Sequence, residues 1–171
     1  MNKPSITIGI SVYDRINEAK VSAMLARSVL TEHFNVHIVI AACKPETVAD
    51  LLVEPFIDTV LVPDVKKTVN YNFNVHSNLG AARTFSSFLK CGAHAQNNNS
   101  DFYCFGNAGS WLLSPQGILE ITSNLNKQKK LVACRVSKKD RKYTVEDHFF
   151  LINLKLSKDV TFFEEKFFNR L

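Results

Sequence analysis

Apolar residues recur along the chain in two rhythms that predict alternating strands and helices. Residues 6–12 alternate apolar with small polar side chains, which is typical of a strand. Residues 36–40 are apolar almost throughout, and this favours a parallel strand buried on both faces. The remaining strands are predicted at 59–62, 102–105, 131–136 and 145–156.

Helices are predicted between these strands. Val21, Met24, Leu25 and Val29 fall at helical spacing and predict one face of a first helix. Ser114 and Pro115 supply the cap and the first position of another. The other helices are predicted at 46–53, 81–95 and 162–168, with a polar loop over 66–77.

This succession predicts one α/β domain over residues 1–171, a three-layer α/β/α sandwich with a mainly parallel sheet and right-handed crossovers. Ligands of such sheets bind at the carboxyl ends of the strands. Five residues are predicted at those ends: Tyr13, Asp14, Cys43, Gly106 and Asn107.

Composition narrows the class of protein. No apolar run approaches the roughly 20 residues of a membrane span, and the N-terminus lacks the apolar core of a signal peptide, so a cytoplasmic protein is expected. The four cysteines form no Cys-x-x-Cys pair, which predicts buried free thiols and no zinc site. The histidines His33, His37, His76 and His94 show no shared face or ligand spacing.

The net charge of +5 is concentrated in one segment. Residues 127–142 contain eight basic residues and one acidic residue, a local charge of +7. Two interpretations stay open: a patch that meets phosphates or an acidic partner, and a solvated loop. Tyr143 is the one aromatic residue nearby, so the segment matches no nucleic-acid-binding module, and none is predicted.

Two stretches carry a resemblance. Asn78-Leu79-Gly80-Ala81-Ala82-Arg83 precedes a helix, and the strand that follows ends in Asn107-Ala108-Gly109 before Pro115 opens the next helix. With Ser11-Val12-Tyr13-Asp14-Arg15 after the first strand, this order resembles the family 2 glycosyltransferases of the GT-A, or nucleotide-diphospho-sugar transferase, fold. The resemblance implies a nucleotide-sugar donor and a glycan or lipid-linked acceptor.

The resemblance also implies a binding cleft. Gly80 lets backbone approach a ligand, the helix start attracts phosphate, and Arg83 neutralises it. Trp111 either stacks on a sugar or base or packs below the sheet. The expected nucleotide-sugar-binding residues are Ser11, Tyr13, Asp14, Asn78, Gly80, Arg83, Asn107 and Trp111.

The chain departs from the family at three positions. Ala41-Ala42-Cys43 lacks the Asp that receives the base, and Asn107-Ala108-Gly109 replaces the carboxylates that hold Mn or Mg. No Mn or Mg site built from side chains is therefore predicted. The family's catalytic base follows a Phe-Phe element that resembles residues 162–168, and the sequence ends at Leu171 before that point.

Two residues near the last strand are candidates for the missing base. Asp147, in the pair Glu146-Asp147, is either a displaced base or a solvated carboxylate. His148 is either an acid or base near neutral pH or a partly exposed strand residue.

Two functions remain open. The first is metal-independent glycosyl transfer, in which Arg83 and the stretch Lys138–Lys142 stabilise the leaving diphosphate. The second is a catalytically inactive GT-A-like module that binds a nucleotide, a sugar or a protein. The oligomeric state stays open in both.

Overall fold

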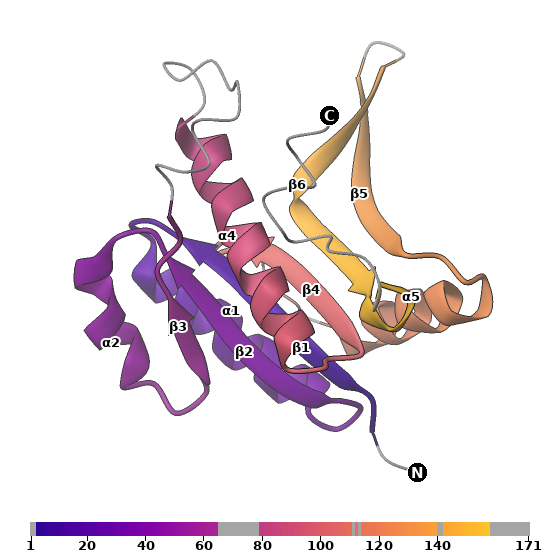
Figure 1. Cartoon of the computed structure of the whole chain (residues 1–171), viewed down its shortest axis with the longest axis horizontal. Helices are drawn as coiled ribbons and strands as arrows, with labels where there is room; N and C mark the ends of the chain where they lie inside the picture. Colours follow the sequence, from indigo (N-terminus) through magenta and orange to yellow (C-terminus); the bar gives the residue numbers. More distant parts are fainter. Residues whose placement is uncertain (1–2, 65–78, 111, 113, 140–141, 158–171) are drawn as a thin grey trace.

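A six-stranded sheet forms the centre of the molecule (Figure 1). The computed structural model describes residues 3–64, 79–110, 112, 114–139 and 142–157. The strand order is β3-β2-β1-β4-β6-β5, and β6 alone runs against the others. The mainly parallel sheet is thus confirmed. The strands are β1 (Ser5–Val12), β2 (Asn35–Ala42), β3 (Thr59–Leu61), β4 (Phe102–Asn107), β5 (Val132–Lys139) and β6 (Lys142–Asn153).

Alternation along β1 divides the core into two layers. Ile6, Ile8, Ile10 and Val12 are buried under α1 (Ile16–Leu30) and α5 (Pro115–Lys127). On the opposite face, α4 (Leu79–Asn97) covers the sheet (Figure 1). Two shorter helical segments, η1 (Pro45–Thr47) and α2 (Val48–Leu52), lead into β3. The predicted three-layer arrangement is confirmed.

The predicted apolar face of α1 is wrong at Val21 and Met24, whereas Val29 packs against the core as a partly buried residue. Val21 and Met24 are exposed, whereas the buried residues of α1 are Ala19, Ser22, Ala23, Ala26 and Leu30. Alanines let the helix lie close to β1 and β2, and Val21 and Met24 are turned away from that contact.

A close contact fixes α4 against β1. An ideal Cβ on Gly9 would lie 2.8 Å from Cε2 of Tyr103 and 2.9 Å from Cβ of Cys91. Tyr103 is fully buried, and its hydroxyl donates a hydrogen bond to the Phe88 carbonyl at 2.8 Å. Glycine at position 9 therefore sets the spacing between the sheet and the helix.

The last strands differ in extent from the prediction. The strand β5 runs on to Lys139, and β6 begins at Lys142 and ends at Asn153, where η2 (Leu154–Leu156) follows. The hairpin extends away from the rest of the sheet (Figure 1). The predicted loop at 66–77 and helix at 162–168 lie outside the described residues.

Candidate functional site

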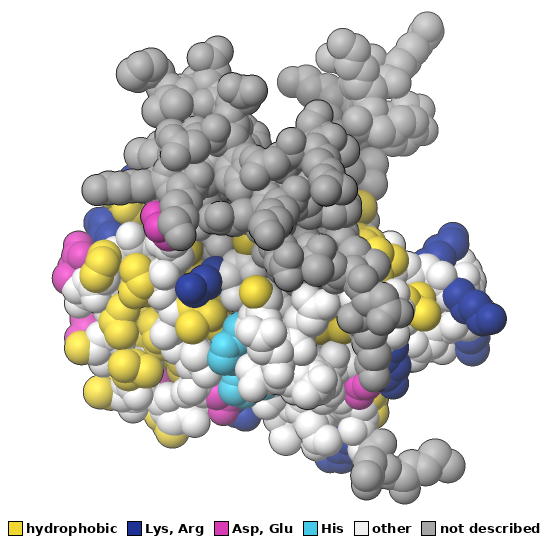
Figure 2. Space-filling view, in the orientation of Figure 1, with side chains coloured by type: hydrophobic (Ala, Val, Ile, Leu, Met, Phe, Trp, Pro, Cys, Tyr) yellow, Lys and Arg dark blue, Asp and Glu magenta, His cyan; other side chains and the backbone are white. Residues whose placement is uncertain are grey.

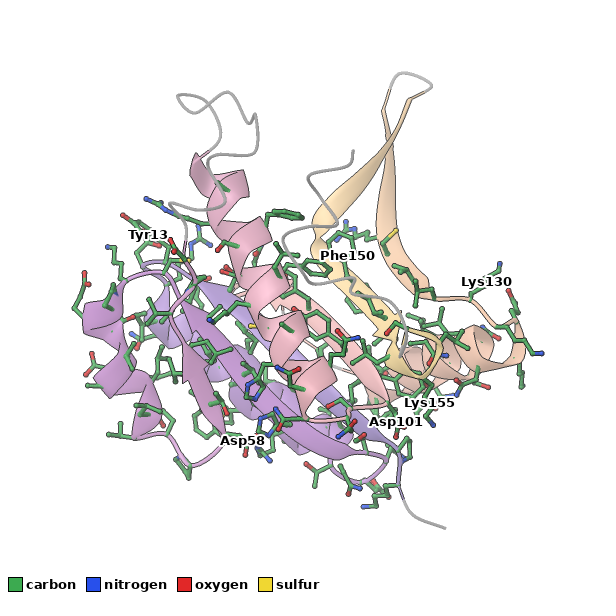
Figure 3. The ribbon with its side chains drawn as sticks, in the orientation of Figure 1. Tyr13, Asp58, Asp101, Lys130, Phe150 and Lys155 are labelled. Atoms are coloured by element: carbon green, nitrogen blue, oxygen red, sulfur yellow. The ribbon has the colours of Figure 1, made fainter. Side chains whose placement is uncertain are left out.

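A pocket opens where the carboxyl ends of β1 and β4 meet the start of α4. Its volume is about 860 Å³, within the range of roughly 300–1,000 Å³ usual for small-molecule sites. Figure 3 labels Tyr13 at this end of the sheet and Asp58 and Asp101 at the opposite end. The polar and charged lining comprises Ser11, Tyr13, Asp14, Arg15, Ser22, Cys43, Arg83, Thr84, Asn107, Ser110 and Arg135.

Six of the predicted binding residues line this one pocket. One lies near the end of β1, two directly follow that strand, two come from the first turns of α4 and one from the end of β4. Asn78 and Trp111, also predicted, lie outside the described residues. The six lining residues are Ser11, Tyr13, Asp14, Gly80, Arg83 and Asn107.

A row of small polar groups lies between the sheet and α4. The Ser11 hydroxyl donates to the Ser87 hydroxyl at 3.0 Å, and Sγ of Cys43 lies 3.5 Å from the same Ser87 oxygen. Ser11 and Ser87 are buried, whereas Cys43 is half-buried and lines the pocket. The hydroxyl hydrogen of Ser11 is thus engaged, and a ligand would meet this residue as an acceptor.

Two cations lie over the Tyr13 ring. Cζ of Arg83 is 3.6 Å from the ring centroid, and Nζ of Lys44 is 4.3 Å from it. Tyr13 is 37% exposed, so these contacts occur at the mouth of the pocket. A cation–π contact at an exposed ring contributes about 0.5–1 kcal/mol. A phosphate can therefore compete for the Arg83 guanidinium.

The loop after β4 is fixed by hydrogen bonds. The Ala108 N–H donates to the Ser11 carbonyl at 3.0 Å, and the Ser110 N–H donates to the Asn107 carbonyl at 2.8 Å. The Ser22 hydroxyl of α1 donates to the Ser110 carbonyl at 3.1 Å. The loop at residues 107–110, which occupies the place of the metal-binding motif in the family that the sequence resembles, is thus attached to both β1 and α1.

This loop has the wrong chemistry for a divalent cation. Its side chains offer the Asn107 amide and no carboxylate. An ideal Cβ on Gly109 would lie 3.3 Å from Oε2 of Glu18, which is paired with Arg15 at 3.2 Å. Among the described residues, no group of three His, Cys, Asp or Glu side chains is placed to hold a metal.

Asp147 and His148, the predicted catalytic residues, lie on β6. Phe149 is paired with Gly106, and β6 runs antiparallel to β4. His148, the residue before Phe149, therefore lies one position closer to the carboxyl end of β4 than Phe149 does. The backbone of this segment is placed, and its side chains lie outside the described part of the structure. Their chemical role stays a prediction.

Sequence reasoning missed two pocket arginines. Arg15 follows β1, and Arg135 lies on β5 at a point where the pairing with β6 changes register. Arg15 belongs to the quoted motif after the first strand and could have been included on that ground. Arg135 belongs to the basic stretch, but its approach to the pocket depends on an irregularity that composition does not reveal.

The statement that the histidines share no face is wrong for one pair. Nε2 of His37 on β2 lies 3.2 Å from Nε2 of His94 on α4, and histidine side chains gather at this surface (Figure 2). Burial and the neighbouring His37 hold the pKa of His94 below its ordinary value. Asp58 lies 3.5 Å from Nδ1 of His37 and is also bound by Arg27. The pair lies away from the pocket.

Comparisons with known proteins identify the fold. No family model matches the sequence, and no curated protein matches it. The WbbM bifunctional glycosyltransferase structure aligns with a TM-score of 0.50 and 15% identity, over 95% of this chain and 34% of that one. CMP:2-keto-3-deoxy-manno-octonic acid synthetase complexed with CTP aligns with a TM-score of 0.49 and 8% identity, over 99% of this chain and 81% of that one. Mouse xyloside xylosyltransferase 1 aligns with a TM-score of 0.44 and 13% identity, over 99% of this chain and 74% of that one.

The chain has a GT-A-like α/β fold. At 15% identity this likeness shows the fold alone, and the chain spans about a third of the WbbM length. Within the described residues, no helix has both the length and the apolar character needed to cross a membrane.

Proposed function

We propose that the pocket binds a nucleotide-sugar and that the chain takes part in transfer of the sugar to a glycan or lipid-linked acceptor. The observation that supports this most strongly is the convergence of Ser11, Tyr13, Gly80, Arg83 and Asn107 on one pocket of suitable volume. The pocket lies at the carboxyl ends of parallel strands, where ligands of such sheets bind. The GT-A-like fold is consistent with this choice.

In this proposal the diphosphate lies at the start of α4. Within the described part of the chain, no atom would come within 4 Å of an ideal Cβ on Gly80, and the backbone there is open to a ligand on that side. The first N–H groups of a helix attract phosphate, and Arg83 adds a charged donor one turn further on. Release of the nucleoside diphosphate would then be assisted by fixed positive charge, which stabilises the departing oxygen.

The transfer step needs a base for the acceptor. The acceptor hydroxyl oxygen attacks the anomeric carbon, the bond from that carbon to the diphosphate oxygen breaks, and the hydroxyl proton passes to the base. We assign the base to the β6 segment that carries Asp147 and His148, which come directly before Phe149, the partner of Gly106 at the end of β4. This assignment rests on position along the strand.

A second candidate function is binding without transfer. It is favoured by the loop Asn107-Ala108-Gly109, which has no carboxylate to hold a divalent cation between two phosphates. In that case the nucleotide or sugar would be recognised in the same pocket and released unchanged.

Calorimetric titration distinguishes these functions. Nucleoside diphosphates and their sugars are titrated into the protein with Mn and with EDTA, and sugar release is followed by chromatography with candidate acceptors. Replacing Arg83 with Ala is expected to weaken diphosphate binding by about 1.5–3 kcal/mol, the usual contribution of a charged hydrogen bond. Lys130→Ala is the matched control because Lys130 lies far from Tyr13 (Figure 3).

Binding followed by appearance of the sugar on an acceptor supports transfer, and binding without that product supports the second function. The absence of binding by every nucleotide tested would contradict both. Binding that is equally strong in wild type and Arg83→Ala would remove Arg83 from the site.

A further inference from the structure

Three arginines from separate elements line the pocket. Arg15 comes from the turn after β1, Arg83 from α4 and Arg135 from β5. Among the described lining residues, Asp14 supplies the single carboxylate. The charged lining is therefore net positive, and a positively lined cleft concentrates anions.

Arg15 is held beside the loop after β4. Its Nη1 lies 3.2 Å from Oε2 of Glu18. A Cβ on Gly109 would lie 3.8 Å from that Nη1 and 3.3 Å from that Oε2. The ion pair is too exposed, at 68% and 41%, to add much stability. Its consequence is positional: a Cβ on Gly109 would crowd the Glu18 carboxylate, so the glycine leaves room for Glu18, and Glu18 in turn holds Arg15 beside the loop.

Arg135 reaches the pocket at an irregularity of the hairpin. Cys134 pairs with Phe150, and Val136 pairs with Val145. One residue on β5, Arg135, thus stands opposite the four residues 146–149 on β6. Irregular pairing of this kind redirects a side chain and is common beside functional sites.

We infer that Arg15, Arg83 and Arg135 together bind the diphosphate of the donor, in the place that a divalent cation would otherwise take. This inference rests on the proposed function for the identity of the ligand, but its chemistry requires only a pyrophosphate group. Planar guanidinium groups bind phosphate oxygens through paired hydrogen bonds, and they keep their charge at any physiological pH. Binding should therefore be independent of divalent metal.

The test uses inorganic pyrophosphate as the probe, with a nucleoside diphosphate in parallel. Titrations of the full chain are made in EDTA at fixed ionic strength. Arg15→Ala and Arg135→Ala are each expected to raise the Kd for pyrophosphate at least tenfold, and Arg135→Lys is expected to recover part of that loss. Lys130→Ala, which removes the same charge outside the pocket, should change the Kd less than twofold. Circular dichroism confirms that each variant is folded.

The outcomes separate this inference from the proposed function. Nucleotide binding that needs Mn, or that is unchanged in Arg15→Ala and Arg135→Ala, overturns the arginine site and leaves the nucleotide pocket standing. Pyrophosphate binding that depends on the arginines, without binding of any nucleotide or nucleotide-sugar, supports the arginine site and overturns the proposed function. Binding of neither probe overturns both.

Discussion

Gly9→Ala tests the contact that sets the spacing between α4 and the sheet. The added methyl would lie 2.8 and 3.0 Å from Cε2 and Oη of Tyr103 and 2.9 Å from Cβ of Cys91. Tyr103 has no exposed surface and is bound to the Phe88 carbonyl, so its ring has little room to move. Inserting a carbon into a packed core costs about 1–3 kcal/mol. We expect a loss of that size.

Equilibrium unfolding in urea, followed by circular dichroism, measures the change. For a chain of this length about 1 kcal/mol corresponds to roughly 2–4 °C in Tm, so Gly9→Ala should melt roughly 2–12 °C lower. Gly117→Ala is the matched control because Gly117 lies inside α5 and a Cβ there would have no neighbour within 4 Å among the residues that the structure describes. It should gain about 0.5–1 kcal/mol from helix propensity.

The same variant reports on the pocket. Because α4 also carries Gly80 and Arg83, a helix displaced from β1 should weaken pyrophosphate binding as well. A Gly9→Ala protein as stable as wild type would show that α4 does not depend on this contact and would refute the packing argument.

Three further predictions concern charge. Burial and the neighbouring His37 lower the pKa of His94 below 6.5, so the stability of the protein should fall as the pH drops below about 6.5. The urea midpoint of His94→Gln should depend less on pH than that of wild type. Burial alone would raise the pKa of Asp101, but the hydrogen bond from the Ser5 N–H and the other partners lower it below 3.8. The stabilisation by Asp101 is therefore present above pH 3.8 and is lost as the pH falls below 3.8 through the lower pKa of the folded state. Asp101→Asn should be less stable than wild type at pH 7 and should approach it over that acidic range. Gly109→Asp should create Mn binding detectable by calorimetry, because Gly109 lacks a positive φ and lies beside the Glu18 carboxylate. Gly109→Asn should not bind Mn, and equal Mn binding by the two variants would contradict this prediction.

The order of strands and helices could be predicted because each leaves a local periodicity. Residues 6–12 alternate, and Pro115 opens α5 as predicted. The buried face of α1 could not be predicted in the same way, because small residues contribute little to the hydrophobic periodicity. Ala23 and Ala26 are buried, whereas the more hydrophobic Val21 and Met24 are exposed.

The candidate site was predictable where motifs follow strand ends. Tyr13 directly follows β1 and Asn107 ends β4, the adjacent parallel strand, so their meeting follows from topology. Arg135 was not predictable, because its place depends on a register change between β5 and β6. The contact between His37 and His94 joins residues 57 positions apart and depends on how α4 packs over β2.

Chemical-shift mapping by NMR tests the central claim most directly. The protein is titrated with the nucleoside diphosphate that binds best, in EDTA, and backbone amide shifts are followed. We predict saturable shifts at the pocket amides of Ser11, Gly80 and Asn107, with Asp101 and Asn126 at the opposite end unchanged. Shifts confined to the opposite end, or no saturable shift at the pocket, would contradict the assignment of this pocket as a nucleotide site.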